Sequence, residues 1–314
     1  MSLSIKQIIN IFLFYFIIVL TSCKEKTNKK IETGLKKTTQ TENDSSRKRL
    51  INFKTFVANL DSNNVSSSSM AAYKFIELFK IKDLTTIDSA YLIFNEFYDK
   101  LTKQLNLQHE KDDLNYDSLF IVYDDGKEHP KLSKKIINYQ KKLSENGFKI
   151  AMDEGITYIK QDRKFITQFF CPFVSNSMKE YLLQINKEIE QGFDTDQGIF
   201  LSPNDFGERI TWWEGFIDRN PNFILKNKCM EIYKFYFSHL ILGKENTPVL
   251  NYDTQNISLY FMDLYEYLLK KHAKLKTTEL LKPYYFAIIR KNKSEMEQIK
   301  RSYKQKNLIE IYAE

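Results

Sequence analysis

The sequence predicts a mainly α protein, built as an irregular array of helical hairpins in the manner of an α-α solenoid. The chain has 314 residues but only nine glycines and six prolines, and this scarcity favours long helices over a turn-rich β fold. In several segments, apolar residues recur at three- and four-residue spacing with charged residues between them. No self-similar repeat of about 34 to 47 residues is recognisable, so a regular repeat array is not expected.

Residues 1–22 have the pattern of a signal peptide. An apolar stretch over residues 8–20 contains no charged side chain, and it follows a single positive charge at Lys6. A helix needs roughly 20 apolar residues to cross a bilayer, whereas the apolar region of a secretory signal needs about 7 to 15. The length of the stretch therefore favours a signal peptide over a membrane-spanning helix.

The end of this segment, Leu-Thr-Ser-Cys at residues 20–23, resembles the lipobox of bacterial lipoproteins, which signal peptidase II cleaves before the cysteine. The resemblance covers residues 1–23 only. It implies that Cys23 carries a thioether-linked diacylglycerol and that acyl chains such as palmitate attach the mature protein to a membrane. The alternative is an uncleaved amino-terminal membrane helix in which the cysteine occurs by chance.

After the cysteine, residues 23–50 are expected to form a disordered tether. Residues 24–50 hold nine Lys/Arg and four Asp/Glu with few apolar side chains, too few to offset the entropy of ordering. Surface-exported lipoproteins of some Gram-negative bacteria resemble one another in an acidic stretch at this place. Because this stretch is basic, we expect an outer-membrane lipoprotein on the periplasmic face rather than on the cell surface.

The remaining residues, 51–314, are expected to form one helical globular domain, which a sub-boundary near 126–131 would divide. The segment near 114–126 fits either a small β element or an irregular loop. Helical spacing of apolar residues predicts helices over 70–79, 89–107, 132–170 with an interruption near Gly147, 178–193 and 223–242.

Capping signals place the later helices more sharply. Ser202 and Pro203 are the residues preferred at a helix start, and they predict a helix over 203–219. Gly243 is the expected left-handed cap at the end of the helix over 223–242. A final pair of helices is predicted over 256–272 and 277–305.

Charge is distributed unevenly along the domain. Residues 270–306 hold twelve Lys/Arg and three Asp/Glu, although the whole chain carries a net charge of only +7. Such a segment is usually a solvated helix face, but it also suits anionic lipid head groups or an acidic partner. The export signal argues against nucleic acid as a partner. Cys171 and Cys229 lie among apolar residues, and the sequence leaves open whether they pair.

Familiar catalytic and cofactor motifs are absent, so we expect no cofactor and no metal site. Asp194 and Asp196 begin a stretch similar to a calcium loop, but a calcium-binding EF-hand needs glycine at its sixth and glutamate at its twelfth position. Here glycine is fifth and Asp205 is twelfth, so a polar connection capped by Ser202 is the better interpretation. His239 lies on an apolar helix and is expected to be a hydrogen-bonded core residue.

Two carboxylates are weak catalytic candidates. Glu154 and Tyr158 are four residues apart, so they share one face if residues 132–170 are helical. Glu208 belongs to the helix over 203–219, and if the two helices pack together, Glu154 and Glu208 would form a carboxylate pair. An interhelical ion pair explains the same residues without any catalysis.

The helix over 203–219 also supplies weak candidates for binding, because Arg209, Trp212 and Glu214 combine a large aromatic side chain with both signs of charge. Tyr158 is a further weak candidate for binding. Trp213 shares a stripe with the apolar residues of this helix and is expected in the core. Since adjacent residues on a helix point about 100° apart, Trp212 is expected at the flank and partly exposed.

Two function classes follow. The first is a lipid-anchored helical scaffold or binding protein of the cell envelope, whose partner is a protein or an envelope component. The alternative is an envelope hydrolase that uses Glu154 and Glu208.

Replacing the predicted lipid acceptor tests the first class directly. Cys23→Ala removes the only thiol at the lipobox, so incorporation of a palmitate analogue during metabolic labelling should fall to background. Cys171→Ala serves as the control and should keep the label. Undiminished labelling of Cys23→Ala would show that the lipobox interpretation is wrong.

Overall fold

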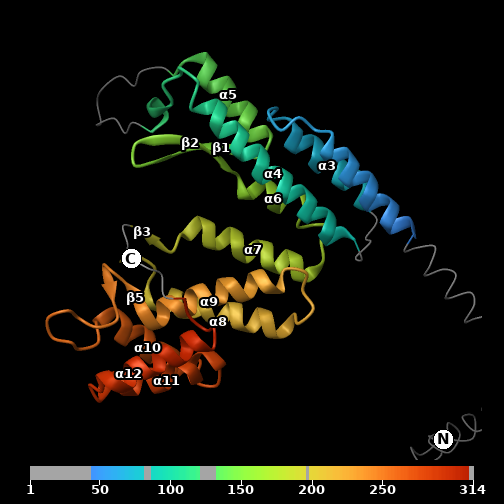
Figure 1. The fold of residues 1–314 in the computed structure, drawn as a ribbon. Helices are drawn as coiled ribbons and strands as arrows, with labels where there is room; N and C mark the ends of the chain where they lie inside the picture. The colour runs from blue at the N-terminus through green and yellow to red at the C-terminus, as the bar shows by residue number, and fades with distance from the viewer. Residues whose placement is uncertain (1–43, 81–85, 121–131, 196–197, 311–314) are drawn as a thin grey trace, which may run out of the picture.

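The computed structural model describes residues 44–80, 86–120, 132–195 and 198–310, and these parts form two lobes (Figure 1). The amino-terminal lobe contains a helix over 44–58, then α3 (Ser67–Phe79), α4 (Ile87–His109), the 3-10 helix η1 (Tyr116–Leu119), α5 (Lys134–Glu145), strands β1 (Phe148–Asp153) and β2 (Ile156–Gln161), and α6 (Arg163–Phe169). The described parts are mainly helical with short two-stranded hairpins, which confirms the predicted fold class.

The carboxy-terminal lobe is a stack of helices connected by turns and two-residue strands. Its elements are α7 (Asn176–Gln191), β3 (Asp194–Thr195), β4 (Gly198–Ile199), α8 (Pro203–Arg219), α9 (Lys226–Leu242), β5 (Gly243–Lys244), β6 (Thr247–Pro248), α10 (Leu259–Lys271), α11 (Lys276–Ile289) and α12 (Lys293–Gln305). Helix α8 packs on α9, α10 and α11 and is the centre of this lobe. None of the helices in the described residues is both long and apolar enough to cross a membrane.

Aromatic side chains fill the core of the amino-terminal lobe. Helix α4 packs on α3 and on β2, while α5 packs on β1. The ring of Phe94 on α4 lies 4.2 Å from that of Phe170 and 5.2 Å from that of Tyr98, measured between centroids. Gly147 has φ +83°, and a Cβ there would meet Phe165 at 2.6 Å, so the chain can turn from α5 into β1 only with glycine at this point.

The predicted helix over 132–170 is wrong between 148 and 161, where the structure has the antiparallel hairpin β1–β2. Buried and exposed residues alternate at the start of β1, as on a half-buried strand. The two residues between the strands, Glu154 and Gly155, have φ of +49° and +80°, as in the two-residue turns that suit a hairpin. The interruption expected at Gly147 does occur, since α5 ends just before it.

The amino-terminal boundary of the domain also differs from the prediction. The helix over 44–58 begins within the predicted tether of residues 23–50 and makes residues 44–50 part of the folded domain. Residues 1–43 lie outside the described residues, as does the suggested boundary at 126–131. Part of the segment 114–126 forms the 3-10 helix η1, which agrees with an irregular element.

Sequence signals at helix ends succeed for α8 and fail for α11. Helix α8 has the predicted bounds, and Ser202 Oγ accepts from the backbone N–H of Asp205 at 3.1 Å. The predicted helix over 277–305 is instead two helices, because Lys291 has φ +54° and Asn292 caps α12. The Asn292 side chain accepts from the backbone N–H of Glu295 at 3.2 Å, the pattern of a new helix start.

The helix over 44–58 should contribute strongly to stability through Phe53. This ring is fully buried and packs edge-on against Phe75 and Phe79, so Phe53→Ala should lower the free energy of unfolding by about 3 to 5 kcal/mol. Ile51→Ala is the matched control, because Ile51 lies on the same helix with 55 % of its surface exposed and should change stability by about 0.5 kcal/mol or less. Urea unfolding followed by circular dichroism measures both. Equal effects would show that the helix is not packed as described.

Candidate functional site

The structure places Glu154 and Tyr158 on the β1–β2 hairpin, so they do not share a helix face as predicted. Glu154 is exposed on the turn, and Tyr158 is half-buried on β2 opposite Ala151. Figure 1 shows this hairpin in the amino-terminal lobe and α8 in the other lobe. The premise of two packed helices that carry Glu154 and Glu208 is therefore wrong.

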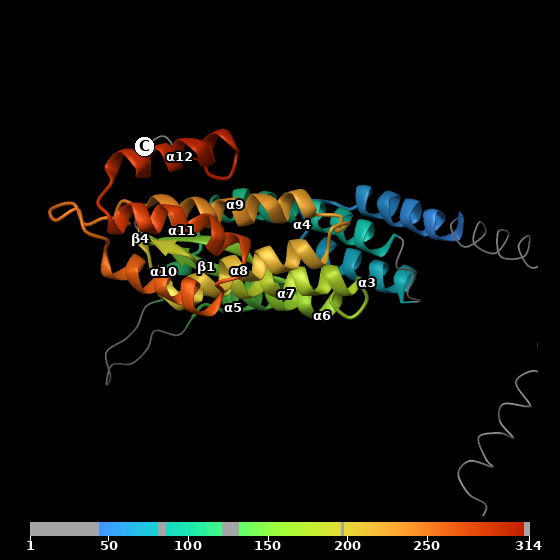
Figure 2. The same cartoon turned by 90° about the horizontal axis from the view of Figure 1, so that it is seen from below.

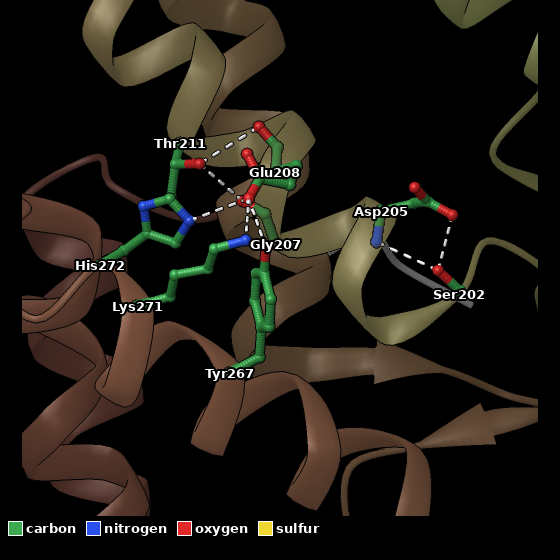
Figure 3. Close-up of polar contacts among 8 residues, drawn as sticks. All are labelled: Ser202, Asp205, Gly207, Glu208, Thr211, Tyr267, Lys271 and His272. Atoms are coloured by element: carbon green, nitrogen blue, oxygen red, sulfur yellow. Dashed lines mark hydrogen bonds and ion pairs between the residues drawn. The ribbon is translucent and has the colours of Figure 1, made fainter.

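Glu208 makes its contacts with α10 and the residue that follows it. Figure 3 shows Tyr267, Lys271 and His272 converging on its carboxylate. Oε1 of Glu208 accepts from the Tyr267 hydroxyl and lies 3.2 Å from His272 Nε2 and 3.7 Å from Lys271 Nζ. The hydrogen bond from Tyr267 lowers the pKa of Glu208, and the same hydroxyl raises the pKa of Lys271. The cluster is an exposed tie between α8 and α10.

Glu214 is buried rather than displayed on a groove. Its Oε1 accepts from the Lys276 backbone N–H at 2.7 Å, and its Oε2 accepts from the backbone N–H and the hydroxyl of Thr277 at 2.9 and 2.5 Å. The first N–H groups of a helix have no partner within the helix, and a carboxylate at that end also suits the helix dipole. Glu214 therefore caps α11 and fixes it on α8.

The two tryptophans lie as their helical spacing predicts. Trp213 is completely buried in the core, whereas Trp212 is half-buried at the flank of α8. The Trp212 ring stacks on Phe216 with centroids 5.1 Å apart and an interplanar angle of 11°. Trp212 is thus partly exposed, and its ring is held by a residue of its own helix.

Glu188 on α7 is the feature that the sequence did not reveal. Its carboxylate is buried and receives three donors, which come from Gln184 Nε2 at 2.6 Å, Trp213 Nε1 at 2.7 Å and the Tyr236 hydroxyl at 2.8 Å. These donors lie on α7, α8 and α9. Burial raises the pKa of Glu188, against the opposing effect of the hydrogen bonds from Tyr236, Gln184 and Trp213 and of the charge of Arg209.

Arg209 lies beside this carboxylate and is also buried. Its guanidinium donates to the Gly192 carbonyl at 2.9 Å and to Gln191 Oε1 at 3.1 Å, at the end of α7. It also lies over the ring of Tyr236, 5.7 Å from the centroid. Arg209 and Glu188 both contact the Tyr236 hydroxyl, which lies 3.4 Å from Nη1 of Arg209 and donates to Glu188 at 2.8 Å.

A hollow of about 450 Å³ opens above these groups between α7 and α9. Its walls are apolar, with Ile189 43 % exposed, and Glu188, Arg209 and Tyr236 lie among its lining residues. The full lining is Ile185, Glu188, Ile189, Gly192, Phe193, Arg209, Lys228, Glu231, Ile232, Phe235 and Tyr236. The hollow therefore combines an apolar wall with a polar floor whose groups are already bonded to one another.

A second, larger hollow of about 600 Å³ lies on the other side of α9. Its lining is Glu214, Ile217, Asp218, Asn227, Met230, Glu231, Tyr233, Lys234, Lys276, Asn307, Leu308 and Glu310. Glu231 belongs to both hollows, and Met230 lines the larger one with 50 % of its surface exposed. We call the two hollows and the exposed face of α9 between them the α9 site.

The remaining sequence predictions concern ligands and cysteines. Cys171 and Cys229 are buried free thiols, and burial raises the pKa of both, that of Cys229 to about 12. His239 is buried with Nδ1 2.8 Å from the Phe235 carbonyl, as expected of a core histidine.

In the stretch similar to a calcium loop, Asp194 pairs with Lys244, and Asp196 lies outside the described residues. In the described parts of the chain, no three His, Cys, Asp or Glu residues are grouped so that they could hold a metal ion.

Comparison with known proteins gives no relative: no family model, no curated protein and no solved structure matches the chain. The candidate site therefore stands on the geometry alone. The one sequence signal that pointed to it is the aromatic and aliphatic content of residues 223–242, which exceeds what a surface helix needs.

Glu188→Gln should change how stability depends on pH. Because the pKa of Glu188 is raised from 4.5 in the folded protein, the folded state keeps a proton above pH 4.5 that the unfolded chain releases. The stability contributed by this group therefore falls as pH rises above 4.5. The free energy of unfolding of the wild type minus that of Glu188→Gln should be largest near pH 4 and decrease toward neutral pH.

Urea unfolding followed by tryptophan fluorescence at several pH values measures this difference. Glu190→Gln, two residues further along α7 and exposed, controls for the loss of one surface charge. A difference that grows with pH for Glu188→Gln would contradict the raised pKa.

Proposed function

We propose that this protein is a lipid-anchored helical binding protein of the cell envelope that holds a protein partner at the α9 site. The observation that supports this most is the pair of hollows on either side of α9, which share Glu231, with the exposed Met230 in the wall of the larger one. Hollows of this size accept large apolar side chains, and methionine adapts its shape to different partners.

The floors of both hollows are rigid, which favours recognition. Glu188 accepts hydrogen bonds from α7, α8 and α9, and Glu214 accepts three from the start of α11, so neither floor needs to rearrange when a ligand enters. Preorganisation of this kind lowers the entropy lost on binding. The envelope hydrolase would need Glu154 and Glu208 as a pair, but the β1–β2 hairpin and α8 lie in different lobes, so binding has better support.

The lining residues indicate the chemistry of the partner. The larger hollow contains four acidic side chains and only two lysines, and Lys234 is already paired with Glu310 at 2.7 Å. Five of the eleven residues that line the smaller hollow are isoleucine or phenylalanine. An amphipathic helical segment fits both, with apolar side chains entering the hollows and a basic side chain facing Asp218 and Glu231.

The location follows from the sequence rather than from the fold. The lipobox resemblance at Cys23 supports anchoring in the outer membrane, and the basic residues after it favour the periplasmic face. The partner is accordingly a periplasmic or envelope protein.

A photo-crosslinking amino acid placed at position 230 in living cells tests the α9 site. It should give a discrete crosslinked product, and the same amino acid at position 259 is the control, because Leu259 is 74 % exposed on α10.

In a separate experiment, Met230→Asp should reduce the partner recovered with the protein at least about tenfold with little loss of stability, whereas Leu259→Asp should not reduce it. Equal crosslinking at both positions, or equal loss in both variants, would contradict the proposed site.

A further inference from the structure

The exposed side of α11 combines apolar and basic side chains. Phe286 and Ile289 are 49 % and 54 % exposed, and with Lys282 they lie at positions i, i+4 and i+7 of one helix. Residues at this spacing share a face. We call the following residues the α11 face: Lys282, Phe286 and Ile289 of α11, Arg290 at its end, Lys291 in the turn that follows and Lys293 at the start of α12.

The other side of α11 is packed against the rest of the protein. Leu281, Tyr284 and Ile288 are buried, and α12 packs along one flank, where the Tyr303 hydroxyl donates to the Leu280 carbonyl. Figures 1 and 2 place α11 and α12 at the edge of the carboxy-terminal lobe that is remote from the other lobe. No described helix covers the α11 face, which leaves its two apolar side chains in water.

The net charge of this region is strongly positive. Twelve Lys/Arg stand against three Asp/Glu between residues 270 and 306. Arg290 is held by Glu295 through two contacts of 2.8 and 2.9 Å, but Lys291 and Lys293 are exposed and form no ion pair with a described residue. A solvated basic face needs no exposed phenylalanine, whereas an interfacial surface uses apolar side chains among lysines.

We infer that the α11 face docks on an anionic lipid surface. Phe286 and Ile289 would enter the boundary between head groups and acyl chains, while Arg290, Lys291 and Lys293 would meet the lipid phosphates. Each basic residue near such a surface strengthens binding by about fivefold, since about 1 kcal/mol per residue is typical. The inference deepens the proposed membrane location, because it orients the domain and leaves the α9 site as a separate surface.

A lipid anchor at Cys23 is compatible with this orientation. A fully extended chain spans at most about 3.3 to 3.6 Å per residue, so residues 24–43 reach up to roughly 70 Å. A compact domain of this size has a radius of gyration of about 18 Å. The anchor therefore does not prevent the α11 face from reaching the membrane from which the chain is tethered.

Vesicle binding of residues 24–314 tests the inference, because this form contains all described residues but no signal peptide and no acyl chain. The probes are phosphatidylcholine vesicles with and without about 30 % phosphatidylglycerol. Partition into the anionic vesicles should exceed that into the neutral ones at least about tenfold, and about 0.5 M salt should largely abolish it.

Two pairs of variants localise the effect. Lys291→Glu with Lys293→Glu should reduce partition into anionic vesicles at least about tenfold, whereas Lys54→Glu with Lys103→Glu changes the net charge equally on the other lobe and should reduce it much less. Phe286→Ser with Ile289→Ser should likewise reduce partition about tenfold. Tyr252→Ser with Leu259→Ser is the control, since these side chains are 68 % and 74 % exposed elsewhere on the same lobe. Circular dichroism confirms that each variant is folded.

Partition that is equal in the α11 variants and in their controls overturns the inference, as does a lack of binding to anionic vesicles. If the protein does not bind anionic vesicles, an acidic protein surface is the partner that the α11 face would suit instead. Crosslinking at position 230 is measured separately in the full lipidated chain, so failure of vesicle binding and failure of the α9 site are distinguishable.

Discussion

The amide NH2, indole and phenol groups of three helices are arranged around one buried carboxylate, that of Glu188. An ionised carboxylate without donors is too costly to bury, so the chain must bring donors to it or keep it protonated. Trp213 and Tyr236 reach it from α8 and α9, at 2.7 and 2.8 Å. Once these bonds form, neither helix can slide or rotate against α7 without leaving a charge unpaired. The width of the hollow between α7 and α9 is a consequence of this constraint.

A second buried carboxylate that accepts hydrogen bonds from another helix lies on the opposite side of α9. Glu214 is buried and binds the first N–H groups of α11, so it holds the start of that helix against α8. The Glu188 carboxylate thus joins the sides of α7, α8 and α9, and the Glu214 carboxylate joins the start of α11 to α8. Between them, α9 is supported from beneath and carries Met230 exposed on its outer side.

Local signals in the sequence allowed α8 to be placed correctly, because Ser202 and Pro203 act only on the residues beside them. The β1–β2 hairpin was missed because its strands are only six residues each, and the turn at Glu154 and Gly155 was placed inside the predicted helix over 132–170. Glu188 and Glu214 were beyond sequence reasoning in this role. Their partners lie up to 48 and 63 residues away, and nothing local distinguishes a carboxylate that will be buried from the other acidic residues of the chain.

The two unpaired thiols have a consequence for how the protein survives oxidation. Cys171 and Cys229 are buried, and their raised pKa keeps them in the unreactive thiol form. The folded protein therefore resists oxidants without the help of a disulfide. An unfolded chain exposes both sulfurs and lowers their pKa toward the ordinary value, so the rate of irreversible oxidation is set by the rate at which the molecule opens. The chemical lifetime of this protein is, in that sense, a property of its packing.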